Sequence, residues 1–345
     1  MHTRDFKNLI TDVPGISVGN KESKELTSGV TVILPDRASI AAVDIRGGGS
    51  GTRDTELLGL DGTVEKVDAI VLSGGSAFGL DAAGGVMAYL RDINRGLAIG
   101  SVRVPIVPQA ILFDLEEYSA KSWHKRPPYW ELGFEAASST SRDFSLGNIG
   151  AGLGAKAGSI KGGLGSSSYF IKELGITVGA LVAVNSAGNV LFPETRTFYA
   201  WDCELNDEFG GIHPPKEINK EAILLPKNTY SGQNTTLAVI ATDAELTKAQ
   251  ARRLAIISQD GLGRAIRPAH TPLDGDIVFS IATGRQKLKN PVRDLSLLGG
   301  YASNSLARAI ARAVYEAKSI NNITAYSDLK NYTSVSYTHL RAHET

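Results

Sequence analysis

Glycine-rich stretches between apolar segments constrain the fold of this chain more than any other feature of its sequence. The chain has 37 glycines, and the longest glycine-rich stretch spans residues 147–165. The interiors of helices and strands both disfavour so many glycines, and the apolar residues between them argue against a flexible linker. We therefore expect backbone packed tightly around a cavity here. Its only charged residues are Lys156 and Lys161, and isolated lysines are usually found at the solvated surface.

The apolar segments themselves follow two periodicities, which predicts an α/β fold. Short β-branched runs indicate buried strands. Longer amphipathic segments indicate helices, one of which begins with the capping-box spacing Thr247-Lys-Ala-Gln250. Strands are expected at residues 29–34, 39–45, 67–72, 176–184, 236–241 and 277–282, and helices at 77–93, from 131, at 247–262 and at 301–318.

Three other segments are less regular. Pro35-Asp36-Arg37 predicts a hairpin-like break between two strands. Residues 97–112 contain two prolines, which indicates a strand that is bent or lies at a sheet edge. Residues 192–232 are rich in charge, proline and glycine and are expected to form an exposed connector.

The composition excludes several classes of function. A formal net charge of zero, without a basic block, argues against a nucleic-acid partner. The polar N-terminus lacks the apolar core of a signal peptide, and no run approaches the ~20 apolar residues that span a bilayer. The single cysteine, Cys203, excludes an internal disulfide framework and a multi-cysteine metal site. The histidines are not paired with carboxylates at ligand spacing. We expect a cytoplasmic enzyme without metal or cofactor.

The boundary between Asn234 and Thr235 is the candidate centre of the chemistry. Gln233 and Asn234 are typical of a loop, whereas Thr236 to Ala241 is typical of a buried strand. Thr235 then either merely begins the strand or follows a peptide bond that breaks itself. In the second case its hydroxyl becomes a nucleophile and its new α-amino group a base. These residues alone leave both interpretations open.

Two aspartates lie at the entrance of the strand expected at 277–282. Asp274 and Asp276 are separated by two positions and so share a face in an extended chain. Two carboxylates on one side are costly unless a cation or a hydrogen-bond donor faces them. They are either turn residues without a catalytic role or members of a site.

Polar residues and glycines also end two other expected strands. Asn185 either caps a turn or points its side-chain N–H into a site. Ser73-Gly74-Gly75-Ser76 joins a strand to a helix but lacks the Lys-Ser/Thr pair of a nucleotide-binding loop. Its glycines instead allow close approach of a substrate or of a neighbouring strand.

Together these residues resemble the P1 family peptidases, the DmpA-like β-aminopeptidases and their relatives. The match runs through nearly all of residues 8–318, and it is the set of motifs in this order that is specific. The motifs are Arg-Gly-Gly-Gly-Ser-Gly-Thr-Arg at 46–53, Leu-Ser-Gly-Gly-Ser-Ala-Phe-Gly-Leu-Asp at 72–81, Gly-Asn-Ile-Gly-Ala-Gly at 147–152, Lys-Gly-Gly-Leu-Gly-Ser at 161–166, Asn-Thr-Thr-Leu at 234–237 and Asp-Gly-Asp at 274–276.

The resemblance implies a self-processing hydrolase of the N-terminal-nucleophile type. Its fold would be a four-layer αββα sandwich like those of DmpA and the ornithine acetyltransferases. One hydrolase domain, residues 1–334, would be cut at Asn234/Thr235 into an α chain of residues 1–234 and a β chain that begins at residue 235. Residues 335–345 continue no pattern and are expected to be a non-native tail. A homo-oligomer of processed units, a tetramer in the family, is also implied.

The resemblance also implies roles for single residues. Thr235 matches the nucleophile, Asn185 the oxyanion-stabilising asparagine, and Asp276 the acidic residue that orients the new amino terminus. Asp274 stands where the aminopeptidase branch has serine and is similar to the nylon-oligomer hydrolase branch. By spacing, Lys156 is the candidate for the active-site lysine of that branch.

The substrate side of the expected site is less specific. Phe113 stands where the aminopeptidases have a functional tyrosine, and Ser73, Gly74 and Gly75 are candidates for substrate contact. We expect an aminopeptidase or amidohydrolase that acts on small peptides or related amides. The alternatives are an endo-acting hydrolase of amide oligomers, an acyltransferase of the ornithine acetyltransferase type, and a binding protein that keeps the fold without catalysis.

Overall fold

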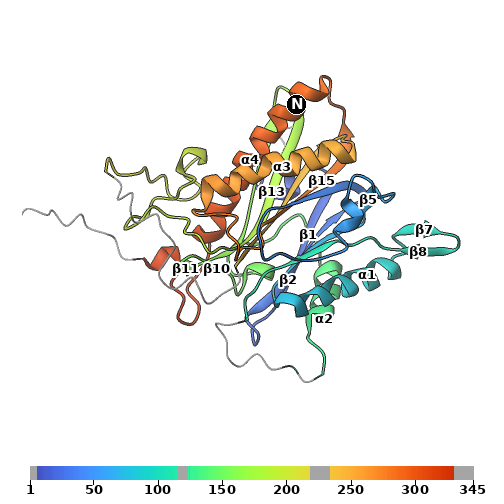
Figure 1. The fold of residues 1–345 in the computed structure, drawn as a ribbon, viewed down its shortest axis with the longest axis horizontal. Coiled ribbons are helices and arrows are strands. Elements are labelled where there is room, and N and C mark those ends of the chain that lie inside the picture. Colours follow the sequence, from blue (N-terminus) through green and yellow to red (C-terminus); the bar gives the residue numbers. More distant parts are fainter. Residues whose placement is uncertain (1–5, 116–122, 124, 218–233, 330–345) are drawn as a thin grey trace, which may run out of the picture.

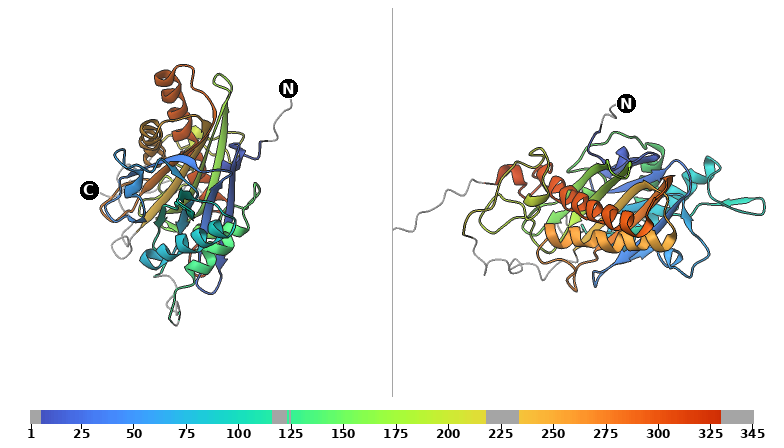
Figure 2. Two further views of the ribbon diagram at one scale, coloured as in Figure 1. Left: turned by 90° about the vertical axis from the view of Figure 1, so that its right-hand side faces the viewer. Right: turned by 90° about the horizontal axis from the view of Figure 1, so that it is seen from above.

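Two β-sheets lie face to face at the centre of the molecule, and a pair of helices covers the outer face of each (Figures 1 and 2). The computed structural model describes residues 6–115, 123, 125–217 and 234–329. The expected four-layer αββα sandwich is confirmed. Among the described residues, no helix is both long enough and apolar enough to cross a membrane.

The larger sheet has six strands, two of which carry the predicted site residues Asn185 and Thr235 at their ends. Its middle strands pair antiparallel, except that β14 and β15 run parallel to each other. In sheet order, the strands are β12 (Gly163–Ile171), β13 (Ile176–Asn185), β14 (Thr235–Ala244), β15 (Ile277–Gln286), β3 (Ser39–Ile45) and β5 (Lys66–Val67).

The second sheet has five strands, and two small hairpins stand apart from both sheets. One hairpin consists of β7 (Leu97–Ile99) and β8 (Val102–Val104), and the other of β10 (Lys156–Ala157) and β11 (Ile160–Lys161). In order, the strands of the second sheet are β1 (Ile16–Ser23), β2 (Ser28–Pro35), β6 (Ile70–Ser73), β9 (Gln109–Ile111) and β4 (Gly51–Arg53).

The position of β14 explains why residues 237–241 of this strand are all apolar. Leu237 and Val239 belong to the core between the two sheets, whereas Ala238 and Ile240 belong to the core beneath the helices. Successive side chains point to opposite faces of a sheet, and both faces of this sheet are covered. The prediction of a buried strand over residues 236–241 is confirmed.

Four helices form the outer layers. Helices α1 (Ala82–Asp92) and α2 (Tyr129–Ser138) pack on each other, and α2 covers β1 and β2. Helices α3 (Lys248–Ala265) and α4 (Pro291–Tyr315) pack together on the six-stranded sheet. The capping box at the start of α3 is confirmed, because Thr247 and Gln250 each bond the other's backbone N–H.

Several expectations about irregular segments are wrong. Pro35-Asp36-Arg37 does not form a hairpin, because β2 and β3 lie in different sheets. Residues 97–112 form the β7–β8 hairpin and then β9, which lies between β6 and β4. The part of the expected connector that the structure describes, residues 192–217, is not simply exposed, because Phe198 and Phe209 are buried in the core.

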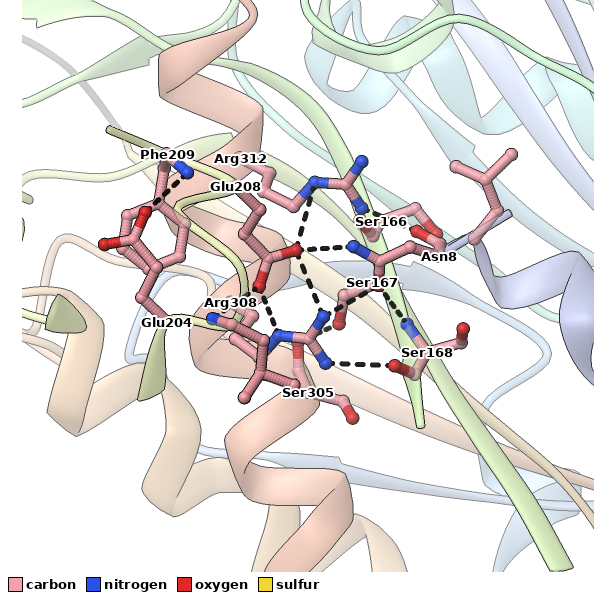
Figure 3. Close-up of polar contacts among 12 residues, drawn as sticks. Asn8, Ser166, Ser167, Ser168, Glu204, Glu208, Phe209, Ser305, Arg308 and Arg312 are labelled. Atoms are coloured by element: carbon pink, nitrogen blue, oxygen red, sulfur yellow. Dashed lines mark hydrogen bonds and ion pairs between the residues drawn. The ribbon is translucent and has the colours of Figure 1, made fainter. Parts of the chain in front are cut away.

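A buried polar network ties the segment before residue 217 to helix α4 (Figure 3). Glu208 pairs with Arg308 and, at 3.5 Å, with Arg312. Arg308 also donates to the Asn8 side chain at 2.8 Å and to the Ser168 carbonyl at 2.9 Å. The Glu208 and Arg308 side chains are only 8% and 4% exposed. The network therefore joins residues on both sides of Asn234/Thr235.

Candidate active site

Thr235 is the first residue of β14, and its side chain is enclosed. The residue is 3% exposed, and a β-carbon placed on Gly275 would lie 2.6 Å from its Oγ1. The hydroxyl therefore lies directly over Gly275, where only a glycine leaves room for it. The prediction that Thr235 begins a buried strand is confirmed.

The peptide bond before Thr235 is held by the neighbouring turn. The Asn234 N–H donates to the Leu273 carbonyl at 3.2 Å. In return, the Gly275 N–H donates to the Asn234 carbonyl oxygen at 2.7 Å. A hydrogen-bond donor thus already faces the oxygen that would become negatively charged if the Thr235 hydroxyl attacked this carbonyl.

Asn185 ends β13 directly opposite Thr235. Residues opposite each other in an antiparallel pair carry their side chains on the same face of the sheet. The Asn185 Oδ1 accepts the Lys156 N–H at 2.9 Å, and its Nδ2 donates to the Phe113 carbonyl at 2.9 Å. Because a backbone N–H can bond only to the oxygen of the amide, its NH₂ group is held as the donor end.

Asp276 holds the start of β14. One carboxylate oxygen accepts the Thr236 N–H at 3.0 Å. The other accepts the His270 N–H at 2.9 Å and lies 2.9 Å from the His270 Nδ1. The carboxylate therefore bridges His270 to the residue that follows Thr235.

Asp274 is fixed by different donors. It accepts hydrogen bonds from the Ala187 N–H at 3.1 Å and from the Thr271 N–H and hydroxyl at 3.0 and 2.7 Å. Burial raises the pKa of Asp274, and the nearby charge of Asp276 raises it further, while the bonds from Thr271 and Ala187 oppose this rise. The two carboxylates thus lie close together and each has the hydrogen-bond donors that their burial requires.

The first glycine cluster packs on the turn that carries the two aspartates. A β-carbon on Gly47 would lie 2.3 Å from both the Asp274 carbonyl oxygen and the Asp276 nitrogen. The Gly49 N–H donates to the Asp274 carbonyl at 2.8 Å. These glycines allow the close backbone contact that fixes the turn.

The candidate substrate residues lie on the other sheet. Ser73 and the two following glycines are buried, and the Gly75 N–H donates to the Asp114 carboxylate at 2.9 Å. The Ser76 N–H donates to the Leu112 carbonyl at 3.0 Å. The turn therefore meets the site through the residues that flank Phe113, whose carbonyl binds Asn185.

A family model for peptidase family S58 matches residues 8–326. The chain belongs to peptidase family S58. The resemblance inferred from the sequence motifs is confirmed, and it rests on nearly the whole chain.

Individual S58 relatives carry different names. An uncharacterized aminopeptidase of Mycobacterium tuberculosis is 42% identical over 343 residues, which cover 93% of this chain and 98% of the relative. A 6-aminohexanoate-oligomer endohydrolase of a Kocuria species is 28% identical over 296 residues, which cover 80% of this chain and 75% of the relative. The solved L-aminopeptidase D-Ala-esterase/amidase of Ochrobactrum anthropi superposes with a TM-score of 0.61 at 21% identity, covering 90% of this chain and 86% of that one. That structure is described as a variant of the N-terminal-nucleophile hydrolase fold.

The sequence does not predict the contacts that two residues of this site make. His270 adopts a left-handed backbone with φ +59°, which places both its N–H and its ring against Asp276. Gly275 supplies both the space beneath Thr235 and the N–H on Asn234. Both belong to the stretch from His270 to Asp276, but nothing in their spacing indicates these contacts.

Lys161 was expected at the surface, and this is wrong. Its side chain is fully buried next to the segment that carries Lys156, and its Nζ donates to three backbone carbonyls. Among the described residues, no group of three or more histidine, cysteine or acidic side chains is placed to hold a metal ion.

Proposed function

We propose that this S58 peptidase cuts its own chain between Asn234 and Thr235 and then uses Thr235 to hydrolyse amide bonds of small peptides or peptide-like amides. The supporting observation is the position of the Thr235 hydroxyl over Gly275, with the Gly275 N–H on the Asn234 carbonyl. Nucleophile, electrophilic carbonyl and oxyanion donor thereby meet at one peptide bond.

The first reaction is an N→O acyl shift. The Thr235 oxygen forms a bond to the Asn234 carbonyl carbon, and the Gly275 N–H stabilises the resulting oxyanion. The carbon–nitrogen bond then breaks, and the hydroxyl proton passes to the leaving nitrogen through the neighbouring aspartates. The raised pKa of Asp274 suits such a proton carrier. The shift thereby frees the Thr235 amino group, and water then hydrolyses the ester to an Asn234 carboxylate and the free Thr235 hydroxyl.

The second reaction uses the new amino terminus. An unperturbed α-amino group has a pKa near 8, so it accepts the hydroxyl proton near neutral pH far better than a lysine does. Thr235 attacks a substrate carbonyl, and the Asn185 NH₂ group stabilises the oxyanion. The leaving amine takes the proton, and water then hydrolyses the acyl-enzyme. Asp276, which holds Thr236, orients the amino terminus.

The name of the 42% identical relative supports an aminopeptidase. The 28% identical endohydrolase and the Asp274/Asp276 pair support an endo-acting hydrolase of amide oligomers as the second candidate. An acyltransferase of the ornithine acetyltransferase type would use the same nucleophile but would require a separate acyl acceptor.

A panel of substrates distinguishes these activities. The purified enzyme is given free and N-acetylated peptide anilides, 6-aminohexanoate oligomers, and an acyl donor with and without an amine acceptor. We expect release of the N-terminal residue from the free peptides and none from the acetylated ones. Cleavage of the blocked substrates and of internal oligomer bonds would favour the endohydrolase. Turnover that depends on the acceptor would favour the transferase, and no turnover of any substrate would contradict all three.

We also propose that the processed units form a cytoplasmic homo-oligomer. The β7–β8 hairpin projects from the body of the molecule (Figure 1) and exposes Leu97, Ile99 and Val102. A lone two-stranded hairpin is only marginally stable in water, so an assembly that covered it would stabilise it. Light scattering of the purified protein after size-exclusion chromatography tests this, and a monomer would contradict it.

A further inference from the structure

Lys161 buries its amino group in a place where the charged form is costly. The residue ends the β10–β11 hairpin and is 0% exposed. Its Nζ donates to the carbonyls of Gly152, Ala155 and Gly162 at 3.1, 2.7 and 2.8 Å. An ammonium group has three N–H donors, so this cage uses all of them. Burying a lysine costs free energy even when it is hydrogen-bonded, and a purely apolar side chain would avoid that cost.

One peptide unit links this cage to the site. The carbonyl between Ala155 and Lys156 accepts from the Lys161 Nζ and, at 3.0 Å, from the Gly162 N–H. The N–H of the same peptide unit donates to the Asn185 Oδ1 at 2.9 Å. A continuous chain of hydrogen bonds therefore runs from the Lys161 ammonium, through a single peptide group, to the side chain of Asn185.

This chain of hydrogen bonds both orients and polarises the Asn185 side chain. A cation on the carbonyl oxygen of a peptide strengthens its N–H as a donor. The strengthened N–H in turn draws electron density toward the Asn185 Oδ1 and makes the NH₂ group of that amide a better donor. The backbone next to Lys161 also packs tightly against the backbone next to Asn185, because a β-carbon on Gly162 would lie 2.0 Å from the Val184 carbonyl oxygen.

We propose that Lys161 is a positioning residue that orients and polarises Asn185 through the Ala155–Lys156 peptide group. The proposal rests on the oxyanion-stabilising role of Asn185 in the proposed function. Lys161 touches neither substrate nor nucleophile. Replacing Lys161 should therefore weaken the stabilisation of the developing oxyanion and lower kcat, and it should leave substrate binding unchanged.

The chain offers a matched control in Lys248. This residue, at the start of α3, is 7% exposed, and its Nζ donates to the carbonyls of Leu57, Gly62 and Val64 at 3.0, 3.1 and 2.8 Å. The variants Lys161→Met and Lys248→Met each remove an ammonium group from a cage of three carbonyls. Only the first cage is linked to Asn185 by a peptide group.

Steady-state kinetics on the self-cleaved fraction of each variant test the proposal. Losing an entire oxyanion donor costs about 10²–10³ in kcat, so weakening one should cost about tenfold. We expect Lys161→Met to lower kcat by about that factor with KM within about twofold. Lys248→Met should leave both parameters within about twofold of the wild type. If Lys161→Met does not fold, Lys161→Gln, which keeps two donors without the charge, takes its place under the same criteria.

A double variant separates positioning from general damage. If Lys161 acts through Asn185, adding Lys161→Met to Asn185→Ala should cause no further loss. An undiminished loss in that background, an equal loss in Lys248→Met, or an unchanged kcat in Lys161→Met would overturn the proposal. Full activity of Asn185→Ala would instead contradict the proposed function, on which this inference depends.

Discussion

Asn185 and Thr235 lie directly opposite each other at the ends of two antiparallel strands, β13 and β14. Asn185 belongs to the part of the chain before the expected cut, and Thr235 is the first residue after it. The register of one strand pair therefore places the proposed nucleophile, Thr235, beside the proposed oxyanion donor, Asn185. A shift of this register by one residue would turn one of the two side chains to the opposite face.

The space beneath Thr235 yields a first prediction. In Gly275→Ala the new methyl carbon would lie 2.6 Å from the Thr235 Oγ1 and 3.0 Å from the Gly49 carbonyl. The hydroxyl and the Gly275 backbone must then move apart, which disturbs the contacts around the Asn234–Thr235 peptide bond, so we expect the chain to remain uncut on a denaturing gel. Gly263→Ala is the control, because an added β-carbon there meets nothing within 4 Å. Normal cleavage of Gly275→Ala would show that the hydroxyl is not confined as described.

The contact between His270 and Asp276 yields a second prediction. His270→Asn keeps a residue that tolerates the left-handed backbone but removes the imidazole from the Asp276 carboxylate. Asp276→Asn changes the carboxylate itself, which bonds both the His270 and the Thr236 N–H groups. We expect both variants to slow self-cleavage and to lower kcat, with Asp276→Asn the more severe. Time courses of fragment formation measure this, and a His270→Asn variant slower than Asp276→Asn would contradict the assignment.

The buried network of Figure 3 yields a prediction for stability. Glu208→Gln would leave Arg308 buried without its carboxylate, and breaking such a pair costs about 3–5 kcal/mol of unfolding free energy. Urea denaturation followed by circular dichroism measures the loss. Glu173→Gln removes a partner of Arg293 in an exposed pair and should have a much smaller effect, because solvent screens the pair. Equal losses in the two variants would mean that burial does not decide the effect.

The buried lysine yields a pH dependence of stability. Burial lowers the pKa of Lys161 from 10.5 to about 7, and the charge of Asp114 opposes this decrease. Between those two values the unfolded chain binds more protons than the folded one, so the free energy of unfolding should rise with pH from about 7 toward about 10. Lys161→Met should lack this rise. Parallel stability curves for the wild type and the variant over that range would contradict the shift.

Sequence periodicity is sufficient to predict those helices and strands in which the burial of each residue depends only on which face of the element it lies on. The run from Thr236 to Ala241 is apolar because both faces of β14 are covered, and the amphipathic helices follow in the same way. The step from β2 to β3 is not predictable in this way. Two strands joined by a short break look like a hairpin whether they pair or enter two stacked sheets.

Some residues of the candidate site could likewise be predicted from the sequence, and others could not. Asp274 and Asp276 could be singled out because two nearby carboxylates demand hydrogen-bond donors. Their donors could not, since Ala187 lies far away in the sequence and His270 reaches Asp276 only through a left-handed backbone. The burial of Lys161 is not predictable from its sequence, because nothing local indicates that three backbone carbonyls enclose its amino group.

The intact mass of the purified protein under denaturing conditions tests the central claim most directly. The account predicts two fragments whose masses correspond to cleavage between Asn234 and Thr235, and a single uncut, inactive chain for Thr235→Ala. An active wild-type protein that remains one chain, or a Thr235→Ala variant that is still cut at this bond, would contradict it.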